Sequence, residues 1–278
     1  MEYSLQAPTN RVKCASPDGT HNVEHSLTLR LDNVSKSFAR VENDGITNAV
    51  QNIDLEMYKG EFVVLVGSSG CGKSTLLRLI AGLITPTLGT LTVNGKQIDG
   101  PDPNHGMVFQ QPTLFPWLTV EQNIGFSFRM QGKKGPEHAR KVEHILRMIG
   151  LEEFRTAFPG QLSGGMAQRV ALARSLICEP EILLLDEPLG ALDAFTRMNM
   201  QDEILSMWKE TRQLVVMVTH DVEEAIYMGT KVIAMDSAPG RIRTVIPIEM
   251  DYPRDRRDAL FVGYRNQILD LLNCGVKD

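Results

Sequence analysis

The sequence predicts an α/β fold with a mainly parallel sheet, an antiparallel β subdomain and an inserted helical subdomain. Largely apolar runs are typical of strands buried on both faces of a parallel sheet, and they occur at residues 62–66, 182–185, 214–218 and 231–235. Segments with helical character separate the last three runs. Strands and helices that alternate in this order imply parallel strands joined by right-handed crossovers.

Shorter segments near the N-terminus predict the antiparallel subdomain. Apolar and polar side chains alternate in residues 27–34 and 49–55, as they do in half-exposed strands. Asn43-Asp44-Gly45 is a turn signal between these two segments. A second turn signal, Asn94-Gly95, lies between two short strand-like segments and predicts a β-hairpin.

Most of the region 112–180 is predicted to be helical. Its clearest helix spans 137–149 and places apolar side chains on one face, namely Ala139, Val142, Ile145, Leu146 and Ile149. Further helices are predicted at 198–212, 222–228 and 259–272. Residues 1–26 are polar and lack periodicity, so we interpret them as a flexible tail. Residues 251–278 form a C-terminal helical extension in this interpretation.

Composition narrows the function classes. With 278 residues and a hydrophobic fraction of 42%, the chain can bury a substantial core. Its net charge of −5 and pI of about 5.7 argue against a protein built around nucleic acid. No apolar run approaches the roughly 18 residues of a membrane helix, and the N-terminus lacks the order of a secretory signal.

A glycine-rich loop follows the apolar run at residues 62–66. Gly67, Gly72, Lys73 and Ser74 fit the pattern G-x-x-x-x-G-K-S. Such a loop turns backbone N–H groups inward around phosphates, and the following helix adds its positive dipole end. Its lysine reaches the outer phosphates, and its serine is a ligand of Mg²⁺. The alternative is a turn that binds nothing, but the preceding strand and following helix favour a nucleotide site.

The nucleotide-binding candidates in this loop are nine consecutive residues: Gly67, Ser68, Ser69, Gly70, Cys71, Gly72, Lys73, Ser74 and Thr75.

Two carboxylates end the apolar run at residues 182–185. Asp186 and Glu187 fall at the carboxyl end of that strand, where doubly wound sheets bind ligands. Asp186 is suited to the Mg²⁺ shell, and Glu187 to taking a proton from an attacking water. The alternative is a pair of solvated acids, which the phosphate loop in the same chain makes less favoured.

A second anion site of the same physical type is predicted at Leu162-Ser163-Gly164-Gly165-Met166. Ser163 suits the N-cap of the helix that follows, and the two glycines let a ligand approach the backbone. By itself, this pattern is weak evidence for an anion site and favours an ordinary capped turn.

Taken in order, these motifs resemble the ATP-binding cassette (ABC) family, over roughly residues 27–240. The resemblance rests on the phosphate loop, Gln110, the segment 162–166, Asp186-Glu187, Gly190-Ala191-Leu192-Asp193 and His220. It implies an ATPase domain at residues 27–250 with a P-loop NTPase core and a helical subdomain at about 112–180. One position departs from the common signature, because Met166 stands where that form has glutamine.

The resemblance also implies roles for single residues. Phe38 matches the aromatic on which adenine stacks, the alternative being core packing. Gln110 matches the glutamine that senses Mg²⁺ and the γ-phosphate, and His220 matches the switch histidine. Asp193 matches the loop that crosses a dimer interface. Ser163, Gly164 and Gly165 would close on ATP held by another subunit, so ATP and Mg²⁺ would lie between two chains.

Partners follow from the same resemblance. Within the family, the segments F-Q-Q-P-T-L-F-P-W at residues 109–117 and Y-P-R-D-R at residues 252–256 resemble those of the ATPases of nitrate, sulfonate and taurine importers. This implies a second ATPase subunit (homodimer or paired homologue), membrane permease subunits and a periplasmic or lipid-anchored solute-binding protein. The chain would then lie peripherally on the cytoplasmic face of the inner membrane. The alternatives are a soluble cassette ATPase without a permease, a non-hydrolysing regulatory module and an exporter.

Two further segments, an apolar cluster and a mixed-charge stretch, lie outside these motifs. Phe115, Trp117 and Leu118 form an apolar cluster, either an ordinary packed loop or, by the resemblance, part of the surface that receives a permease. The mixed-charge stretch with Arg254, Arg256 and Arg257 is interpreted as solvated surface.

Overall fold

The computed structural model describes residues 26–39, 45–132 and 135–273. Its strands are β1 (Leu27–Ala39), β2 (Ile46–Tyr58), β3 (Phe62–Gly67), β4 (Leu88–Val93), β5 (Lys96–Gln97), β6 (His105–Val108), β7 (Ile182–Asp186), β8 (Leu214–Val218), β9 (Lys231–Asp236) and β10 (Arg241–Pro247). Its α-helices are α1 (Lys73–Ile80), α2 (Val120–Ile124), α3 (Phe126–Met130), α4 (Pro136–Met148), α5 (Gly164–Leu176), α6 (Ala194–Thr211), α7 (Val222–Met228) and α8 (Ala259–Asn273). Two short 3-10 helices, η1 (Glu152–Phe154) and η2 (Pro159–Gln161), complete the elements.

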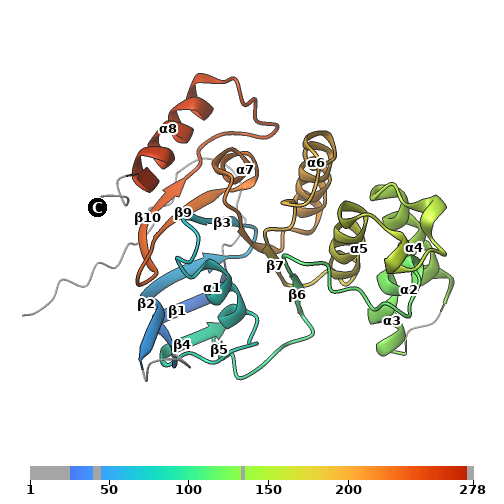
Figure 1. The fold of residues 1–278 in the computed structure, drawn as a ribbon, viewed down its shortest axis with the longest axis horizontal. Coiled ribbons are helices and arrows are strands. Elements are labelled where there is room, and N and C mark those ends of the chain that lie inside the picture. The colour runs from blue at the N-terminus through green and yellow to red at the C-terminus, as the bar shows by residue number, and fades with distance from the viewer. Residues whose placement is uncertain (1–25, 40–44, 133–134, 274–278) are drawn as a thin grey trace, which may run out of the picture.

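Within the described ranges the strands form two sheets. The larger has the order β10-β9-β3-β8-β7-β6, and every pairing in it is parallel except that of β10 with β9. The smaller is antiparallel, with the order β2-β1-β4-β5. Both sheets and their strand directions confirm the predicted α/β architecture. The antiparallel sheet lies at one end of the molecule and helices α2 to α4 at the other (Figure 1).

Alternating side chains of the parallel strands feed two cores, one on each face of the larger sheet. Phe62, Val64 and Val66 of β3 pack in the core that includes residues of α5, α6, α7 and α8. Val63 and Leu65 point to the other core, which includes α1 and the antiparallel sheet. Helices α1 and α5 therefore cover opposite faces of this sheet, which decides where their N-termini lie.

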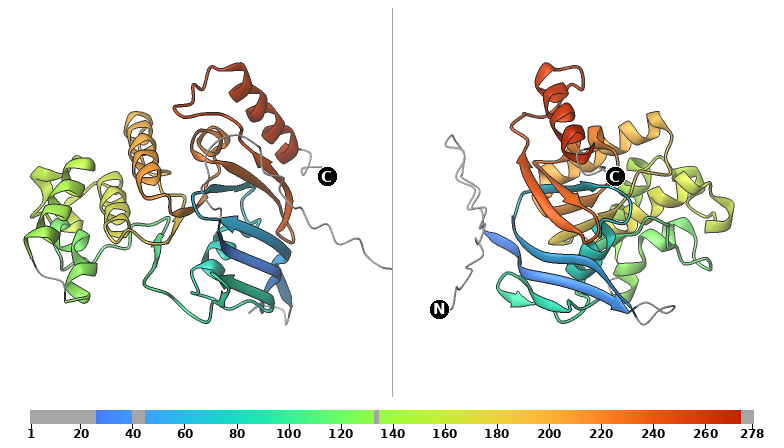
Figure 2. Two further views of the ribbon diagram at one scale, coloured as in Figure 1. Left: turned by 180° about the vertical axis from the view of Figure 1, so that it is seen from behind. Right: turned by 60° about the vertical axis from the view of Figure 1, so that its left-hand side comes forward.

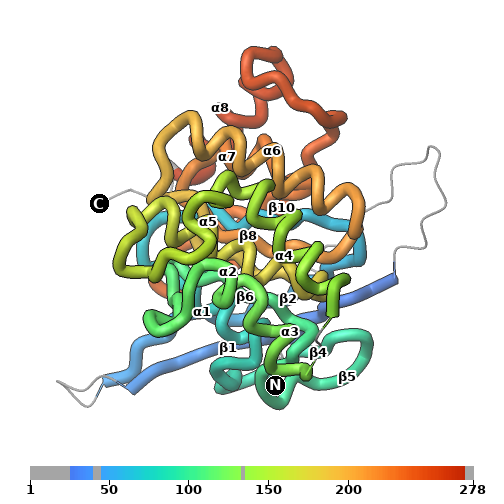
Figure 3. Tube along the Cα trace, turned by 90° about the vertical axis from the view of Figure 1, so that its right-hand side faces the viewer, coloured from blue at the N-terminus to red at the C-terminus, as the bar shows by residue number. Residues whose placement is uncertain are grey.

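The helical region is attached to the sheet through α5. The Gln168 Nε2 group donates to the Phe109 carbonyl at 3.1 Å, and Ser175 Oγ donates to the Met107 carbonyl at 3.0 Å. The Arg174 guanidinium donates to the Thr113 carbonyl at 2.9 Å. These bonds tie α5 to β6 and to the segment after it. Figure 3, viewed from the helical end, shows α2, α4 and α5 in front of the sheets.

Several element bounds differ from the predicted ones. β1 and β2 extend beyond the predicted segments because polar side chains also pair across the ladder; Ser37 Oγ donates to Asn48 Oδ1 at 2.8 Å. Helix α6 begins at Ala194, earlier than predicted, because the Asp193 side chain caps it. Strand β10 was not predicted, since its half-buried side chains show no clean alternation. Ala139 is exposed rather than on the buried face of α4.

The interpretation of the C-terminal arginines as solvated surface was wrong for two of three residues. Arg254 is buried, and its guanidinium donates to the carbonyls of Ile226 and Gly229 at the end of α7. Arg256 is half-buried, whereas Arg257 is exposed and pairs with Asp255. Helix α8 packs against α7 and β9. In Figure 2, α8 is the dark red helix next to the orange strands.

Three predictions concern residues outside the described ranges: the flexible tail, except for residue 26, the Asn43-Asp44 part of the first turn signal, and residues 274–278 of the C-terminal extension. None of the helices in the described ranges has the length and apolar character needed to span a bilayer.

Candidate functional site

The glycine-rich loop joins β3 to α1, as the sequence predicts. Lys73 is buried, and its Nζ donates to the carbonyls of Gly67 at 2.8 Å and Ser68 at 3.0 Å. Ser68, Ser69 and Gly70 are exposed at the crest of the loop. The ammonium group thus lies under an open loop whose backbone is accessible to a ligand, which is the arrangement a phosphate cradle requires.

Close approach of backbone explains why glycine occupies two positions of this loop. Gly72 has φ 90° and precedes α1 as its N-cap, and a Cβ there would lie 2.5 Å from the Ala49 carbonyl oxygen. A Cβ on Gly67 would lie 2.8 Å from the Met235 carbonyl oxygen. The loop is also supported from outside by Gly240, where a Cβ would lie 2.2 Å from the Cys71 carbonyl oxygen. Sequence reasoning missed Gly240 because it is remote in the chain.

Ser74 and Asp186 meet beside the loop. Ser74 Oγ donates to Asp186 Oδ1 at 2.8 Å. Burial raises the pKa of Asp186, and the Ser74 hydrogen bond opposes that rise. A hydroxyl and a buried carboxylate at the edge of a phosphate cradle are hard oxygen ligands, so this pair fits Mg²⁺ completed by phosphate oxygens and water.

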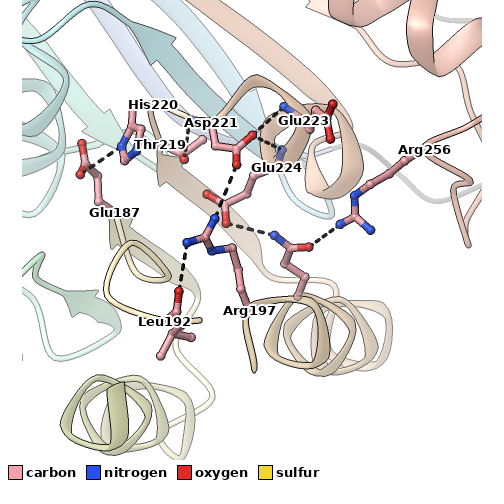
Figure 4. A network of polar contacts seen from close by, with 10 residues as sticks. Glu187, Leu192, Arg197, Thr219, His220, Asp221, Glu223, Glu224 and Arg256 are labelled. Atoms are coloured by element: carbon pink, nitrogen blue, oxygen red, sulfur yellow. Dashed lines mark hydrogen bonds and ion pairs between the residues drawn. The ribbon is translucent and has the colours of Figure 1, made fainter. Parts of the chain in front are cut away.

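Glu187 lies between two side chains from neighbouring strand ends. Gln110 Nε2 donates to Glu187 Oε2 at 3.1 Å, and His220 Nδ1 lies 3.4 Å from the same oxygen. Gln110 follows β6, Glu187 follows β7 and His220 follows β8, so three adjacent parallel strands deliver them to one edge. Glu187 has φ 48°, a left-handed conformation that is uncommon for a residue with a side chain. Figure 4 shows His220 and Glu187 facing each other.

The predicted adenine contact, Phe38, is not a core residue. Its side chain is 42% exposed, and Lys36 Nζ lies 5.1 Å from the centre of its ring. The alternative of core packing is therefore wrong for Phe38, while its predicted contact with adenine stays a prediction.

The signature segment begins α5. Ser163 Oγ accepts a hydrogen bond from the Met166 backbone N–H at 3.3 Å and so caps the helix. This cap uses only the backbone of residue 166, so methionine there leaves it intact. A Cβ on Gly165 would lie 3.1 Å from Leu192, so this glycine lets α5 pack closely against the loop before α6.

Ser74 and Asp186 are joined by a hydrogen bond, but the signature segment, residues 162–166, does not lie beside this chain's own phosphate loop. Ser163 starts a helix that packs on one face of the larger sheet, and the loop starts α1, which packs on the other. Ser163 and Gly164 are exposed. Asp193 is exposed as well, and hydrogen bonds from the Thr196 side chain and from the Thr196 backbone N–H lower the pKa of Asp193.

Arg197 is a further residue that sequence reasoning missed. Its Nη2 donates to the Leu192 carbonyl at 3.0 Å, and its Nη1 lies 3.8 Å from Asp221 Oδ2. Arg197 thus joins the loop ending at Asp193 to the turn that carries His220 (Figure 4). No motif marks it, because only the fold places α6 beside that turn.

Among α/β folds, a phosphate loop whose serine meets a carboxylate at the end of another parallel strand of the same sheet is typical of the P-loop nucleoside triphosphatases. This chain belongs to the ABC transporter family: the family model described as "ABC transporter" matches residues 50–190. The chain is thus an ATPase subunit of the ABC type, and the predicted family resemblance is confirmed.

The sequences of several relatives align with most of this chain. The uncharacterized ABC transporter ATP-binding protein MJ0412 of Methanocaldococcus jannaschii is 45% identical, with 88% of this chain and 91% of the relative aligned. The aliphatic sulfonates import ATP-binding protein SsuB of Bacillus subtilis is 43% identical, with 84% and 91% aligned.

A solved structure with the same fold is the dimeric, ADP- and Pi-bound post-hydrolysis state of the ATP-binding cassette MJ0796. It superposes with a TM-score of 0.72 at 32% identity, over 80% of this chain and 100% of that one.

Proposed function

We propose that this chain is the ATP-hydrolysing subunit of an importer for a small anion, an aliphatic sulfonate or a related solute such as nitrate or taurine. The ATPase subunits work as a pair on membrane permease subunits, at the cytoplasmic face of the inner membrane. A periplasmic or lipid-anchored binding protein delivers the solute.

The phosphate loop binds the nucleotide in this proposal. Residues 67–75 supply backbone N–H groups, and Lys73 turns from the loop carbonyls to the outer phosphates. The exposed ring of Phe38 stacks on adenine. Ser74, Asp186 and Gln110 would hold Mg²⁺, which neutralises charge developing on the phosphates.

Glu187 is the general base and carries the proposal. It follows Asp186 directly, and its Oε2 accepts from Gln110 while it faces His220. A carboxylate held between an amide donor and an imidazole is placed to orient a water and accept its proton. His220 contacts the γ-phosphate, and Gln110 reports the state of the site to the helical region through β6 and α5.

A second subunit completes each site. Ser163, Gly164 and Gly165 present an exposed helix N-terminus, which suits an anion from outside this chain. Asp193 lies in the loop that crosses the dimer interface. The similar MJ0796 cassette is a dimer with ADP and Pi bound in its post-hydrolysis state, which supports the paired arrangement proposed for this chain.

The choice of solute rests on the relatives. Several named for aliphatic sulfonate import are 39–43% identical to this chain. The second candidate, a soluble cassette ATPase without a permease, leaves the largest exposed aromatic of the helical region without a role. Trp117 is 69% exposed, and its ring packs at a tilt against the ring of Phe115, beside the segment that carries Gln110.

Glu187→Gln tests the hydrolytic assignment. This variant keeps the hydrogen bond from Gln110 but cannot accept a proton, so we expect ATP-bound dimers to accumulate in gel filtration while ATP turnover is lost. Glu153→Gln, at an exposed carboxylate in η1, is the control and should behave as the parent. A monomeric Glu187→Gln protein with ATP bound would contradict the paired mechanism.

A further inference from the structure

A chain of polar side chains, half-buried at Arg256 and buried at its other members, connects the C-terminal extension to the turn that carries His220. It starts at Arg256, whose Nη2 donates to Gln201 Oε1 at 2.6 Å. The Gln201 Nε2 group in turn donates to Glu224 Oε1 at 3.1 Å. Gln201 and Glu224 are only 2% and 5% exposed, so the bond between them is shielded from water, and the bond from half-buried Arg256 is partly shielded. Figure 4 shows this chain running from Arg256 towards Glu224.

The Arg256 guanidinium is held in place from two sides. Besides its hydrogen bond to Gln201, it lies 4.0 Å from the centre of the Tyr227 ring. Arg254, two residues earlier, fixes the extension to the end of α7 through the Ile226 and Gly229 carbonyls. Arg256 therefore reaches Gln201 from an anchored segment, which is what a directed contact requires.

The orientation of the Gln201 amide follows from its two partners. A guanidinium donates only, so the amide must present its oxygen to Arg256 and its NH₂ to the Glu224 carboxylate. A rotated amide would place its oxygen against the carboxylate and its NH₂ against the guanidinium. Arg256 thus keeps a donor pointed at a buried carboxylate.

Glu224 connects Gln201 to the turn of residues 219–221, which carries His220. Burial raises the pKa of Glu224, and hydrogen bonds from Thr219 and Gln201 oppose the rise by favouring the charged form. Thr219 Oγ1 also accepts from the Asp221 N–H at 3.1 Å, and Asp221 Oδ1 accepts from the N–H groups of Glu223 and Glu224. His220 lies between Thr219 and Asp221, so its backbone is held at both neighbours.

We propose that Arg256 is a positioning residue for hydrolysis: through Gln201 and Glu224 it fixes the turn of residues 219–221 and hence the distance between His220 and Glu187. This inference rests on the roles proposed for Glu187 and His220. It gives the C-terminal extension a part in turnover, although Arg256 itself contacts neither nucleotide nor the general base.

The test measures steady-state ATP hydrolysis by the full chain, with ATP binding and thermal unfolding measured alongside. Arg256→Met keeps an apolar stem and removes the donor. We expect kcat to fall about tenfold, the scale of one lost hydrogen bond to a charged network, with KM and ATP affinity unchanged and Tm lowered by only a few degrees. Arg256→Lys restores a cation and a donor and should recover most of kcat. Arg257→Met removes the neighbouring exposed arginine and should match the parent.

Coupling separates this route from general loosening. Adding Arg256→Met to Gln201→Met should cost nothing further, because the chain is already broken at Gln201. Parental kcat in Arg256→Met, or an equal loss in Arg257→Met, would overturn the proposal. If Arg256→Met unfolds, Gln201→Met decides the matter, and parental kcat there would overturn it.

His220→Ala distinguishes a failure of this proposal from a failure of the proposed function. Parental turnover in His220→Ala would refute the proposed role of His220. Lost turnover in His220→Ala with parental turnover in Arg256→Met would refute only the role of Arg256.

Discussion

Gly240 is predicted to control the shape of the phosphate loop from outside it. The residue lies between β9 and β10, and a Cβ there would lie 2.2 Å from the Cys71 carbonyl oxygen and 2.6 Å from the Ala49 carbonyl oxygen. Ordinary contact begins at 3.4 Å, so Gly240→Ala requires the loop or the β9–β10 turn to shift by about 1.2 Å. Its backbone bonds to Ala49 and Gln51 hold the turn and direct the shift towards the loop.

A displacement of about 1 Å at a pre-organised site costs on the order of 100-fold in efficiency. We therefore expect kcat/KM for ATP to fall by about 10- to 100-fold in Gly240→Ala, and affinity for a fluorescent ATP analogue to fall with it. Overpacking should also lower the free energy of unfolding by about 1–3 kcal/mol.

The control is the same substitution at Gly263, in α8, where an added Cβ meets nothing within 4 Å. Gly263→Ala should leave ATP binding unchanged and raise stability by about 0.5–1 kcal/mol, because alanine favours a helix interior. If Gly240→Ala binds and hydrolyses ATP like the parent, the close packing of this turn does not constrain the loop, and the reasoning is refuted.

Three further predictions concern the signature, the helical region and the buried network. Ser163→Arg should abolish ATP hydrolysis, because it removes the α5 cap and places a bulky cation where another subunit's ATP would approach. Ser163→Thr keeps the cap and should retain activity. An active Ser163→Arg variant would show that residues 162–166 are not part of the site. Trp117→Glu should uncouple transport while basal ATP hydrolysis stays parental, measured in membranes with and without permease; parental transport would contradict the docking role. Glu224→Gln should become more stable relative to the parent as pH rises from 4.5 through the raised pKa of Glu224. Over this pH range the folded parent keeps a proton on Glu224 that the unfolded chain has lost, so the parent loses stability as Glu224 ionises. Denaturant unfolding of both proteins across pH measures the difference in their free energies of unfolding, and a difference that does not change with pH would count against this prediction.

The sequence was sufficient wherever a function depends on neighbours in the chain. The phosphate loop is contiguous, so its glycines, Lys73 and Ser74 could be identified from spacing alone. Asp186 and Glu187 follow an apolar strand, and the parallel order of the strands already implied that strand ends meet at one edge. The capping role of Ser163 needs only the next three residues, and the structure shows the same cap.

Contacts between distant segments were decided by the tertiary structure. Nothing in residues 251–258 distinguishes a buried arginine from an exposed one, because burial of Arg254 depends on carbonyls that the end of α7 leaves without helical partners. Gly240 is a turn glycine in sequence and a support of the phosphate loop in space. Gln201, Glu224 and Arg256 read as ordinary polar residues until α6, α7 and the extension pack together. Local spacing thus determined which groups carry the chemistry, and packing decided what holds them in position.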